Sequence, residues 1–526
     1  MRIGIDVGGT NTDAVLMDGR TVLAERKTPT TKDVTSGILA ALAGLRAQRA
    51  FEPRQVRGVM IGTTHFTNAV VERRRLQQTA AIRLALPATA ALPPMVDWPD
   101  ELRQAIGGHA YLCHGGYEFD GREISPFDEA EVRRAAEDIA GRGIETVAIS
   151  SVFSPVNADM ERQAGAIVEQ VIPAAHLSFS HEIGRVGLLE RENATILNAC
   201  LRQLAAEITQ ALQSAVRESE IEAPLFISQN DGTLMSVDYC RRYPVLTFAS
   251  GPTNSMRGAA FLSGEADCIV ADIGGTTSDV GALQHGFPRE ASVAVDVGGV
   301  RTNFRMPDVL AYGLGGGSLV VEGAAGIRVG PQSVGYEITE RARCFGGEEL
   351  TATDLAVAAG LAEIGDPARV RGLDAALVAR GVAEIQHRVA ELVDRVKTSA
   401  TALPVVVVGG GSVLLRDELE GASRLVKPDH FSVANAIGAA IAQVGGETDK
   451  VFSLAELSRE EALEQAREEA TAKALAAGAD AGSMQIVDVE EVPLAYLPSN
   501  AVRIRVKAVG DLQLEAEDGR DVAARP

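Results

Sequence analysis

The phrase "DVGGTNTD" at residues 6–13 returns almost unchanged as "DIGGTTSD" at residues 272–279, and this repeat decides the fold of the chain. In each copy an apolar strand ends in an aspartate, two glycines turn the chain, and a second strand returns. A single copy reads equally well as an ordinary tight hairpin. Two copies that share both acids, both glycines and the first threonine indicate an internal duplication, with one degenerate copy as the remaining alternative.

The residue types in both hairpins suit the binding of an oxyanion. Glycine has no Cβ, so the backbone can approach an anion closely and the N–H groups of the turn can surround it. Threonine and asparagine add neutral donors, and the aspartate at each strand end offers oxygen ligands to Mg²⁺. Two such hairpins facing one cleft would hold the β- and γ-phosphates of one nucleotide. The candidates are Asp6, Gly8, Gly9, Thr10 and Asn11 in the first copy and Asp272, Gly274, Gly275, Thr276 and Thr277 in the second.

Two further glycine motifs follow the second hairpin. In "VVVVGGGSVLL" (405–415) a buried strand opens into Gly409, Gly410 and Gly411, where a nucleoside could lie against the backbone; a plain strand-end turn is an equal alternative. The phrase "GLGGGS" (313–318) does not satisfy G-x-G-x-x-G, so it is a weak indication of a dinucleotide site. The chain has no G-x-x-x-x-G-K-[ST], which excludes a P-loop as the phosphate-binding device.

Composition excludes several classes of protein. A chain of 526 residues with 46% hydrophobic residues predicts two or three globular domains. The net charge of −21 repels phosphate backbones, so we expect no nucleic-acid partner. Five scattered cysteines without a C-x-x-C pair predict neither a zinc site nor a disulfide framework, and they fit a reducing cytoplasm. The N-terminal residues enter a strand directly, and no apolar run is long enough to span a bilayer, so we expect no signal peptide and no membrane segment.

Hydrophobic periodicity predicts an α/β fold in three parts. Residues 1–187 form a first half, which begins with a meander of three strands and contains an irregular insertion near 87–125. Residues 188–450 form a second half, which begins with a long connecting helix and continues with the strand Leu225–Ser228. Residues 451–526 form a small appendage of one helix and two strands.

The paired hairpins and the late glycine-ended strand resemble the superfamily of actin, sugar kinases and heat-shock chaperone ATPases. Its fold consists of two duplicated ribonuclease-H-like α/β halves around an ATP cleft. Within it, the chain is similar to the hydantoinase A/5-oxoprolinase family over roughly residues 3–445. The motifs, in order, are "GIDVGGTNTDAVL", "GTTHFTNAVVER", "SHEIGRVGLLERENATILNACL", "SQNDGTLMS", "FASGPTNSMRGAAFL", "DIGGTTSDV" and "GLGGGSLVV".

This resemblance implies an ATP-dependent hydrolase subunit. Members of the family use ATP to phosphorylate an amide, lactam or ketone oxygen, and a second protein or domain usually completes the ring opening. For this chain the resemblance implies ATP and Mg²⁺ as cofactors, a cyclic amide such as hydantoin, 5-oxoproline or another lactam as substrate, and a separate partner subunit. The alternatives are a small-molecule kinase and an ATP-driven activator or carboxylase-type subunit of a partner enzyme.

The resemblance also assigns roles to individual residues. Asp6 and Asp272 belong to the magnesium–phosphate network, and Asp13 and Asp279 either orient the hairpins or act as a base. The substrate contacts are Thr63, Thr64 and Asn68, while His65 is either a base or a structural histidine. His181, Arg185, Glu190 and Arg191 either reach the cleft or have a solvated or inter-domain salt-bridge role, and Asn435 is placed near the nucleotide. The chain departs from the family over residues 329–347, "VGPQSVGYEITERARCFGG", where members carry a proline-rich phrase.

Overall fold

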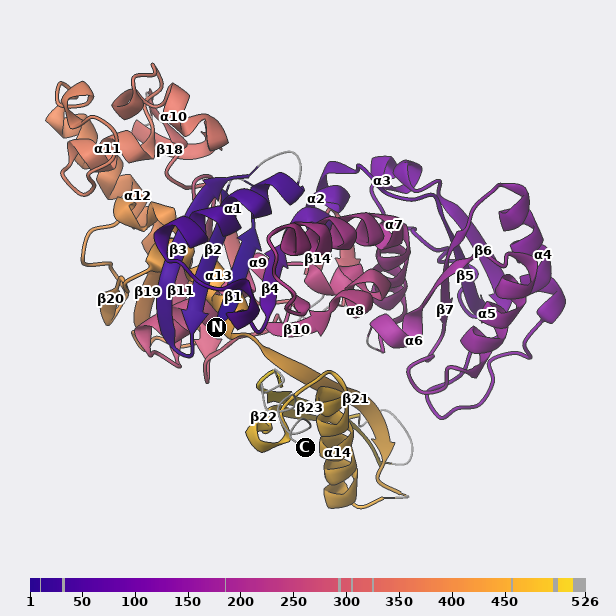
Figure 1. Cartoon of the computed structure of the whole chain (residues 1–526). Helices are drawn as coiled ribbons and strands as arrows, with labels where there is room; N and C mark the ends of the chain where they lie inside the picture. The colour runs from indigo at the N-terminus through magenta and orange to yellow at the C-terminus, as the bar shows by residue number, and fades with distance from the viewer. Residues whose placement is uncertain are drawn as a thin grey trace, which may run out of the picture.

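The structure is a computed structural model of the chain, shown in Figure 1. It describes all residues except 10, 31–33, 185, 292–294, 304–305, 324–325, 456, 495–499 and 514–526. Thr10, one of the predicted phosphate-binding residues, and Arg185, a candidate cleft residue, therefore lie outside the described residues. The described part contains two central sheets, a third sheet in a separate lobe, and a C-terminal appendage.

The first central sheet contains the first hairpin. A meander of three antiparallel strands is followed by two strands that run parallel to β1, in the order β9-β4-β1-β2-β3. The register pairs Asp6 with Asp13 across the hairpin. Every residue of β1 after the first is buried, because helices cover the sheet, and this is why the strand reads as a nearly continuous apolar run. The strands are β1 (Arg2–Val7), β2 (Asn11–Asp18), β3 (Thr21–Pro29), β4 (Val59–Thr63) and β9 (Leu225–Ser228).

The second central sheet repeats this arrangement. Its order is β20-β19-β11-β12, with β16 paired to β12, and its register pairs Asp272 with Asp279. As in the first sheet, the next strand along the order, β19, runs parallel to the strand that ends in the first acid. The duplication predicted from the two phrases is therefore present in strand order, direction and register. The strands are β11 (Cys268–Ile273), β12 (Ser278–Gln284), β16 (Val309–Tyr312), β19 (Pro404–Val408) and β20 (Arg424–Val426).

One strand lies in a different sheet from the one expected. The sequence analysis places Leu225–Ser228 in the second half, but this strand, β9, pairs in parallel with β4 and completes the first sheet. Its neighbour β10 (Thr233–Ser236) extends the same sheet. A short apolar strand after a long helix looks the same in either sheet, so periodicity alone could not assign it. The division of the chain at residues 187 and 450 stays a prediction, and the first sheet continues past residue 187.

Residues 79–179 form a lobe with a sheet of its own, at the right of Figure 1. Four parallel strands in the order β6-β5-β7-β8 are covered by α4 (Glu129–Gly141) and α5 (Asp159–Val171). The region near 87–125, predicted to be irregular, contributes the helix α3 (Asp100–Ala105) and the strand β6 to this lobe. Both elements are only six residues long and lie among prolines and glycines, so they show no hydrophobic periodicity of their own. The strands are β5 (Thr79–Leu86), β6 (His109–His114), β7 (Thr146–Ser151) and β8 (His176–Phe179).

The long connecting helix is α7 (Leu188–Glu218), which closely follows the prediction. It packs against α1 (Val34–Gln48) of the first half and against β7 of the lobe, so it joins the two. Where α7 meets the lobe, Arg83 of β5 and Glu192 of α7 form a buried ion pair, and Ser150 of β7 donates a further hydrogen bond to Glu192.

Two helices pack closely between the central sheets. α9 (Ser250–Ser263) and α13 (Ala434–Ile441) approach backbone to backbone, because each has a glycine at the contact. A Cβ on Gly258 would lie 1.9 Å from the carbonyl oxygen of Ala434, and a Cβ on Gly438 would lie 1.9 Å from that of Asn254. The small residues of α13 thus allow the two helix backbones to approach this closely.

The second half contains an additional lobe, at the upper left of Figure 1. The hairpin of β17 (Ser318–Gly323) and β18 (Gly326–Ser333) contacts α11 (Ala352–Ala358) and α12 (Ala375–Val396). Asp374 caps α12 by accepting hydrogen bonds from two backbone N–H groups of its first turn. Valine, isoleucine and leucine at helical spacing bury one face of α12.

The C-terminal appendage extends the first sheet. β21 (Gln443–Ser453) pairs with β10 and with β23 (Ala501–Gly510), which in turn pairs with β22 (Gln485–Pro493). Four alanines four residues apart bury one side of α14 (Arg459–Ala476). The sequence analysis predicts the helix and the last two strands but not β21, which crosses its boundary at residue 450.

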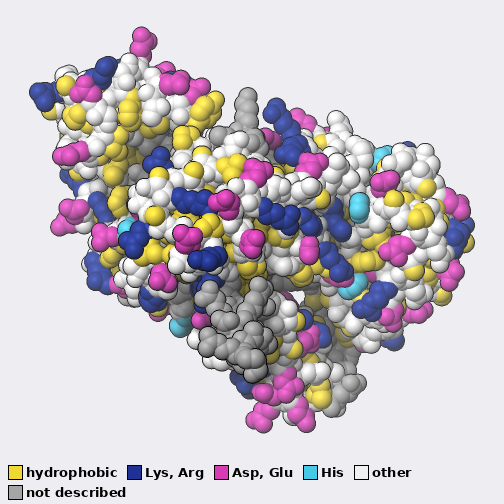
Figure 2. Space-filling model, viewed as in Figure 1, with side chains coloured by type: hydrophobic (Ala, Val, Ile, Leu, Met, Phe, Trp, Pro, Cys, Tyr) yellow, Lys and Arg dark blue, Asp and Glu magenta, His cyan; other side chains and the backbone are white. Residues whose placement is uncertain are grey.

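The surface and the thiols agree with the composition. Acidic and basic side chains are interspersed over the face drawn in Figure 2. All five cysteines are free and buried, so none forms a disulfide. Among the helices of the described residues, none is both long and apolar enough to cross a membrane.

Candidate functional site

Both glycine hairpins line a single cleft of about 400 Å³ between the two central sheets. The loop that follows β19 lines the same cleft, so the three glycine motifs singled out in the sequence meet in space. Asp279 is the one predicted hairpin acid that does not line this cleft. The hairpin and loop residues in the cleft wall are Asp6, Gly8, Gly9, Asn11, Asp13, Asp272, Gly274, Gly275, Thr276, Thr277, Gly409, Gly410 and Gly411.

The turns of the two hairpins have the same backbone geometry. In the first, the Gly8 N–H donates to the carbonyl oxygen of Asn11 over 3.0 Å, and in the second the Gly274 N–H donates to that of Thr277 over 2.8 Å. Neither Gly9 nor Gly275 has a neighbour within 4 Å of a Cβ built on it, so the tips of both turns face open space. Backbone N–H groups at such tips can reach an anion in the cleft.

A glycine lies beside the first acid of each hairpin. A Cβ on Gly62 of β4 would lie 2.4 Å from Asp6 Oδ1, and a Cβ on Gly409 would lie 2.2 Å from Asp272 Oδ1. Gly409 also has φ = +84°, a conformation that residues with a Cβ rarely adopt. A side chain at Gly62 of β4, or at Gly409 directly after β19, would therefore collide with the carboxylate beside it. Only glycine at these two positions leaves room for Asp6 and Asp272.

The "GLGGGS" loop supports the second hairpin. Gly316 N–H donates to the carbonyl oxygen of Gly274 over 3.0 Å, and Gly317 N–H donates to that of Gly275 over 2.7 Å. A Cβ on Gly315 would lie 2.5 Å from the Thr276 nitrogen, so the loop can pack here only without a side chain. These contacts give a structural reason for the glycines of a motif to which the sequence analysis assigns no site.

In the first hairpin, an amide and an ammonium group contact the two acids. Asn435 Nδ2 donates to Asp6 Oδ2 over 2.9 Å and to Asp13 Oδ2 over 3.0 Å. Lys27 Nζ lies 2.6 Å from Asp13 Oδ1 and donates to Asp13 Oδ2 over 2.7 Å. Burial, together with the negative charges of Asp13 and Asp272, raises the pKa of Asp6 to about 7. Burial also raises the pKa of Asp13, with Lys27 and Asn435 acting in the opposite direction.

In the second hairpin, the acids have fewer partners. Among the described side chains, Ser255 of α9 donates a hydrogen bond to Asp272. Burial raises the pKa of Asp272, and this hydrogen bond acts in the opposite direction. No described side chain donates a hydrogen bond to Asp279, and burial, followed by the charge of Asp272, raises its pKa to about 7. The second hairpin thus has the same acids without a neighbouring cation or amide.

The cleft acids fit a magnesium ion. Asp6 Oδ1 is buried and has no hydrogen-bond partner, and like charges surround it, so a cation would stabilise its ionised form. The described residues contain no cluster of three or more histidine, cysteine or acidic ligands. Mg²⁺ commonly binds one or two carboxylates together with phosphate oxygens and water, which is the donor set that Asp6 and Asp272 could provide.

Part of the cleft wall is apolar. Ile338, Phe345 and Ile364 line the cleft, and so does Phe431, which begins the short helical turn before α13. Two of these residues lie in the stretch 329–347, where the sequence departs from the family pattern. The departure therefore falls on the wall of the cleft.

The predicted substrate residues lie outside this cleft. Thr63 ends β4 and is buried, with its Oγ1 2.6 Å from Nδ1 of His65. Thr64 Oγ1 donates to the Val7 carbonyl oxygen, and Asn68 on α2 (His65–Glu72) donates to Thr64 Oγ1, both at the 3.5 Å limit of a hydrogen bond or just below it. Burial lowers the pKa of His65 to about 4, which keeps its ring neutral at pH 7. These hydrogen bonds are local, and a substrate role for the three residues remains a prediction.

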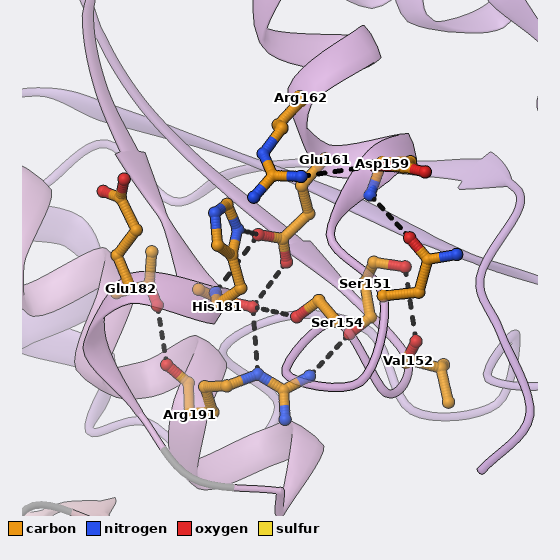
Figure 3. Close-up of polar contacts among 12 residues, drawn as sticks. Ser151, Val152, Ser154, Asp159, Glu161, Arg162, His181, Glu182 and Arg191 are labelled. Carbon is orange, nitrogen blue, oxygen red and sulfur yellow. Dashed lines mark hydrogen bonds and ion pairs between the residues drawn. The ribbon is translucent and has the colours of Figure 1, made fainter. Parts of the chain in front are cut away.

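The residues at the start of α7 form a buried network away from the cleft (Figure 3). Glu161 accepts hydrogen bonds from Ser180 Oγ and the His181 backbone, and its Oε2 lies 2.5 Å from His181 Nδ1. Arg191 donates to Ser180 Oγ and to the carbonyl oxygens of Val186 and Ser151. Glu190 forms a partly exposed ion pair with Arg301. These contacts join α7 to the lobe of β5–β8, which corresponds to the inter-domain alternative of the sequence analysis.

Two side chains that contact the hairpin acids, those of Lys27 and Ser255, were not predicted from the sequence. Lys27 lies at the end of a strand rich in charged residues, where a lysine is ordinary. Ser255 lies in the middle of a helix with several small polar residues. Only the strand register, which pairs Asp13 with Lys27, and the packing of α9 behind β11 bring them to the acids.

Comparison with known proteins supports the fold. The structure of the ATP-dependent caprolactamase from Pseudomonas jessenii superposes with a TM-score of 0.79, at 20% identity, over 100% of this chain and 90% of that chain. A nucleotide-free acetone carboxylase structure superposes with a TM-score of 0.68, at 17% identity, over 99% of this chain and 89% of that one. These similarities confirm the α/β fold with duplicated halves of the actin-like ATPase type.

Sequence comparison finds relatives that are subunits of enzymes. The chain is 28% identical to the caprolactamase subunit alpha of Pseudomonas jessenii over 68% of its own length and 54% of that protein. It is 27% identical to the acetophenone carboxylase gamma subunit of Aromatoleum aromaticum over 68% of its length and 53% of that protein. The chain thus spans about half the length of these two relatives.

Two family models cover most of the conserved motifs quoted above. The model of the hydantoinase/oxoprolinase N-terminal region matches residues 2–172, and the hydantoinase/oxoprolinase model matches residues 191–366. Together they cover more than half of the chain and include both glycine hairpins. The chain belongs to the hydantoinase/oxoprolinase family.

Proposed function

We propose that the chain is an ATP-dependent hydrolase subunit that activates a cyclic amide by phosphorylating its carbonyl oxygen. The observation that supports this most directly is that both hairpins line one cleft, with their open turn tips and at least one acid of each hairpin in its wall. A polyphosphate held from two sides needs this arrangement. The apolar residues of the cleft wall, such as Ile338 and Phe345, offer a surface for the nucleoside.

The site residues have separate roles in this proposal. The turn N–H groups and the hydroxyls of Thr276 and Thr277 bind the phosphates, while Asp6 and Asp272 hold Mg²⁺, which neutralises phosphate charge when bound. Gly409, Gly410 and Gly411 leave room for the nucleoside. Catalysis then depends mainly on alignment of the reacting atoms and on neutralisation of charge.

The activation step transfers one phosphoryl group. The substrate carbonyl oxygen forms a bond to the γ-phosphorus, the bond from that phosphorus to the β,γ-bridging oxygen breaks, and ADP leaves with the electron pair. For a lactam, the amide proton is released to solvent and an O-phosphorylated imidate remains. Water then attacks the activated carbon; over the whole reaction one ATP and two waters yield ADP, phosphate and the ring-opened amino acid.

The relatives support a partner subunit and the class of substrate. The names of both sequence relatives are those of subunits, one of a caprolactamase and one of an acetophenone carboxylase. We propose a lactam, hydantoin or 5-oxoproline as substrate, and a separate subunit that completes ring opening. A cytoplasmic location belongs to the same proposal, because five buried free thiols fit a reducing compartment.

A ketone-activating subunit of a carboxylase is the second candidate. The specific support is the acetophenone carboxylase relative and the fold shared with an acetone carboxylase that carries out ATP-dependent acetone carboxylation. In this candidate the γ-phosphoryl group passes to the ketone oxygen, the α-carbon loses a proton to solvent, and an enol phosphate and ADP result. In the partner, the α-carbon of the enol phosphate would form a bond to carbon dioxide, and water would release phosphate to leave the keto acid.

Measurement of ADP release tests the proposal. The purified chain, alone and with a co-expressed partner subunit, is incubated with Mg-ATP and hydantoin, 5-oxoproline, caprolactam, acetone or acetophenone. We expect one of the cyclic amides to stimulate ADP release, with a ring-opened product in the presence of the partner. Stimulation by a ketone alone would favour the carboxylase candidate, and a stable phosphorylated product would identify a kinase. Absence of stimulated release under every condition would contradict all three.

A further inference from the structure

Lys27 is the positively charged side chain of the cleft. Of the described residues that line the cleft, it alone is a lysine or arginine. Its ammonium contacts both oxygens of the Asp13 carboxylate, at 2.6 and 2.7 Å. The Lys27 side chain is 35% exposed, whereas that of Asp13 is 4% exposed, so the ammonium lies between the buried acid and the open cleft. An ammonium has three N–H donors, and the carboxylate does not need all of them.

Among the described residues, no lysine or arginine occupies the equivalent place in the second hairpin. Lys27 stands opposite Asp13 in the pairing of β3 with β2. The corresponding position beside Asp279, in the pairing of β16 with β12, is Ala311. A hairpin of the same register and turn geometry therefore forms without a lysine at this place. The fold alone does not require Lys27, which leaves its charge to be explained by what the cleft binds.

The charges of the cleft explain the need for a cation. Asp6, Asp13 and Asp272 line the cleft, and a nucleotide tail adds further negative charge between them. Lys27 also lies near the first acid of its hairpin, because Asn435 donates hydrogen bonds to both Asp13 and Asp6 and so joins the two carboxylates. An ammonium held at Asp13 in the cleft wall lies close to the place where the phosphates would be held.

We propose that Lys27 is a catalytic residue whose ammonium contacts the transferred phosphoryl group, with Asp13 as the positioning residue that holds it. This inference rests on the proposed function. As the phosphorus–oxygen bond to ADP breaks and the bond to the substrate oxygen forms, Lys27 keeps its protons and stabilises the charge on the equatorial oxygens of the phosphoryl group. The same contact gives the cleft a preference for ATP over ADP.

Nucleotide binding tests this contact without any turnover. Titration calorimetry with Mg-ADP and with the β,γ-imido analogue of ATP compares the chain with Lys27→Met, which keeps the length of the side chain and removes its charge. We expect the variant to lose roughly 10- to 100-fold in affinity for the analogue and much less for ADP. Asp13→Asn keeps the ammonium, so it should retain part of the preference for the analogue. Equal losses for both nucleotides would contradict the proposal and indicate a role in holding Asp13 alone.

Turnover provides a second readout. Once an activating substrate is identified, Lys27→Met should reduce kcat roughly 10²- to 10³-fold, and Lys27→Arg should recover part of that loss. Lys450→Met is the matched control, because Lys450 forms a similar ion pair, 2.6 Å from Glu469, on the appendage; we expect about the wild-type affinity and rate. If the wild-type chain binds neither nucleotide, the proposed function itself fails. If it binds both and Lys27→Met keeps the preference for the analogue, only the role of Lys27 fails.

Discussion

The two glycine hairpins have the same backbone and different surroundings. Both have the same register between their acids, the same hydrogen bond across the turn, and a glycine on the adjacent strand that makes room for the first acid. The first hairpin adds Lys27 and Asn435 to its acids. The second has one serine hydroxyl on Asp272, and two glycine loops pack around its turn.

This difference separates what the two hairpins share from what is particular to each. The shared features produce an anion-binding shape twice, which is sufficient to hold a phosphate chain from two sides. Among the features that differ, the ammonium of Lys27 and the amide of Asn435 contact the acids of the first hairpin, whereas the second hairpin has the Ser255 hydroxyl and the two glycine loops. We infer that the second hairpin mainly shapes the cleft and holds the metal, whereas the first also supplies charge to the reacting group.

Replacing the first acid of each hairpin should have the largest effect. Asp272→Asn should reduce ATP turnover roughly 10²- to 10³-fold or more, because no other acid of the second hairpin lines the cleft. Asp6→Asn should have a smaller effect, because Asp13 remains in the wall beside it. Steady-state ADP release as a function of Mg²⁺ concentration measures both.

Thermal unfolding of the metal-free variants is the control for this pair. Burial raises the pKa of each acid, so the neutral amide should leave the melting temperature unchanged or higher. Wild-type turnover of Asp272→Asn would remove that residue from the site. Equal losses in the two variants would show that the hairpins share the metal evenly, against the division of roles inferred above.

The glycine beside each acid gives a second comparison, with a smaller effect. Gly409→Ala forces a Cβ into a left-handed conformation and against Asp272 Oδ1, so it should lower the free energy of unfolding by about 1–3 kcal/mol. Gly62→Ala meets only the ends of the Asp6 and Asn254 side chains. It should cost less stability but displace the Asp6 carboxylate and reduce turnover. Urea denaturation and ADP release separate the two effects.

Gly141→Ala is the matched control for the glycine variants. Gly141 ends α4, has no positive φ and has no neighbour within 4 Å of an added Cβ, so alanine should be neutral or slightly stabilising there. If Gly409→Ala is as stable as this control, the strained glycine would have no part in placing Asp272.

Local sequence patterns predicted much of the fold and the centre of the site. The repeated phrase was sufficient for the duplication, because alternation, paired glycines and terminal acids are all local signals. The helix Leu188–Val216 was predicted from its spacing, and α7 extends it by only two residues. Strand β9 was assigned to the wrong sheet, and β21 was missed, because the partner of a strand is set by long-range packing.

The neighbours of the acids could not be predicted for the same reason. Lys27 and Ser255 reach Asp13 and Asp272 through strand register and helix packing, and no motif marks them. Asn435 was placed near the nucleotide without a partner, and its contacts with Asp6 and Asp13 depend on how α13 lies on β1. The roles of Thr63, Thr64 and Asn68 stay predictions, since none of them lines the cleft.

The pH dependence of stability gives the smallest and sharpest comparison of the hairpins. In metal-free protein, burial raises the pKa of Asp279 from 3.8 to about 7, so its contribution to stability is full below about pH 4 and is lost as the pH rises to 7. In the wild type, ionisation of Asp279 lowers the free energy of unfolding by up to about 1.4 kcal/mol per pH unit across that window. Asp279→Asn should abolish this contribution. Asp13→Asn should instead show its loss only above the raised pKa of Asp13, where the ionised carboxylate is the partner of the Lys27 ammonium. Urea denaturation at several pH values with a chelator present measures both.

Two carboxylates elsewhere separate this effect from general titration. Asp417 is fully exposed, so Asp417→Asn should leave the pH profile unchanged. The pKa of Asp231 is shifted in the opposite direction. Burial raises it, but Lys507 and Thr233 lower it further, to about 2. The contribution of Asp231 to the free energy of unfolding is therefore lost only as the pH falls below 4. Stability that falls between pH 4 and 7 can then be attributed to the buried acids of the hairpins. If Asp279→Asn shows the wild-type slope, the second hairpin does not bury an uncompensated acid, and the contrast with the Lys27-paired Asp13 of the first hairpin is lost.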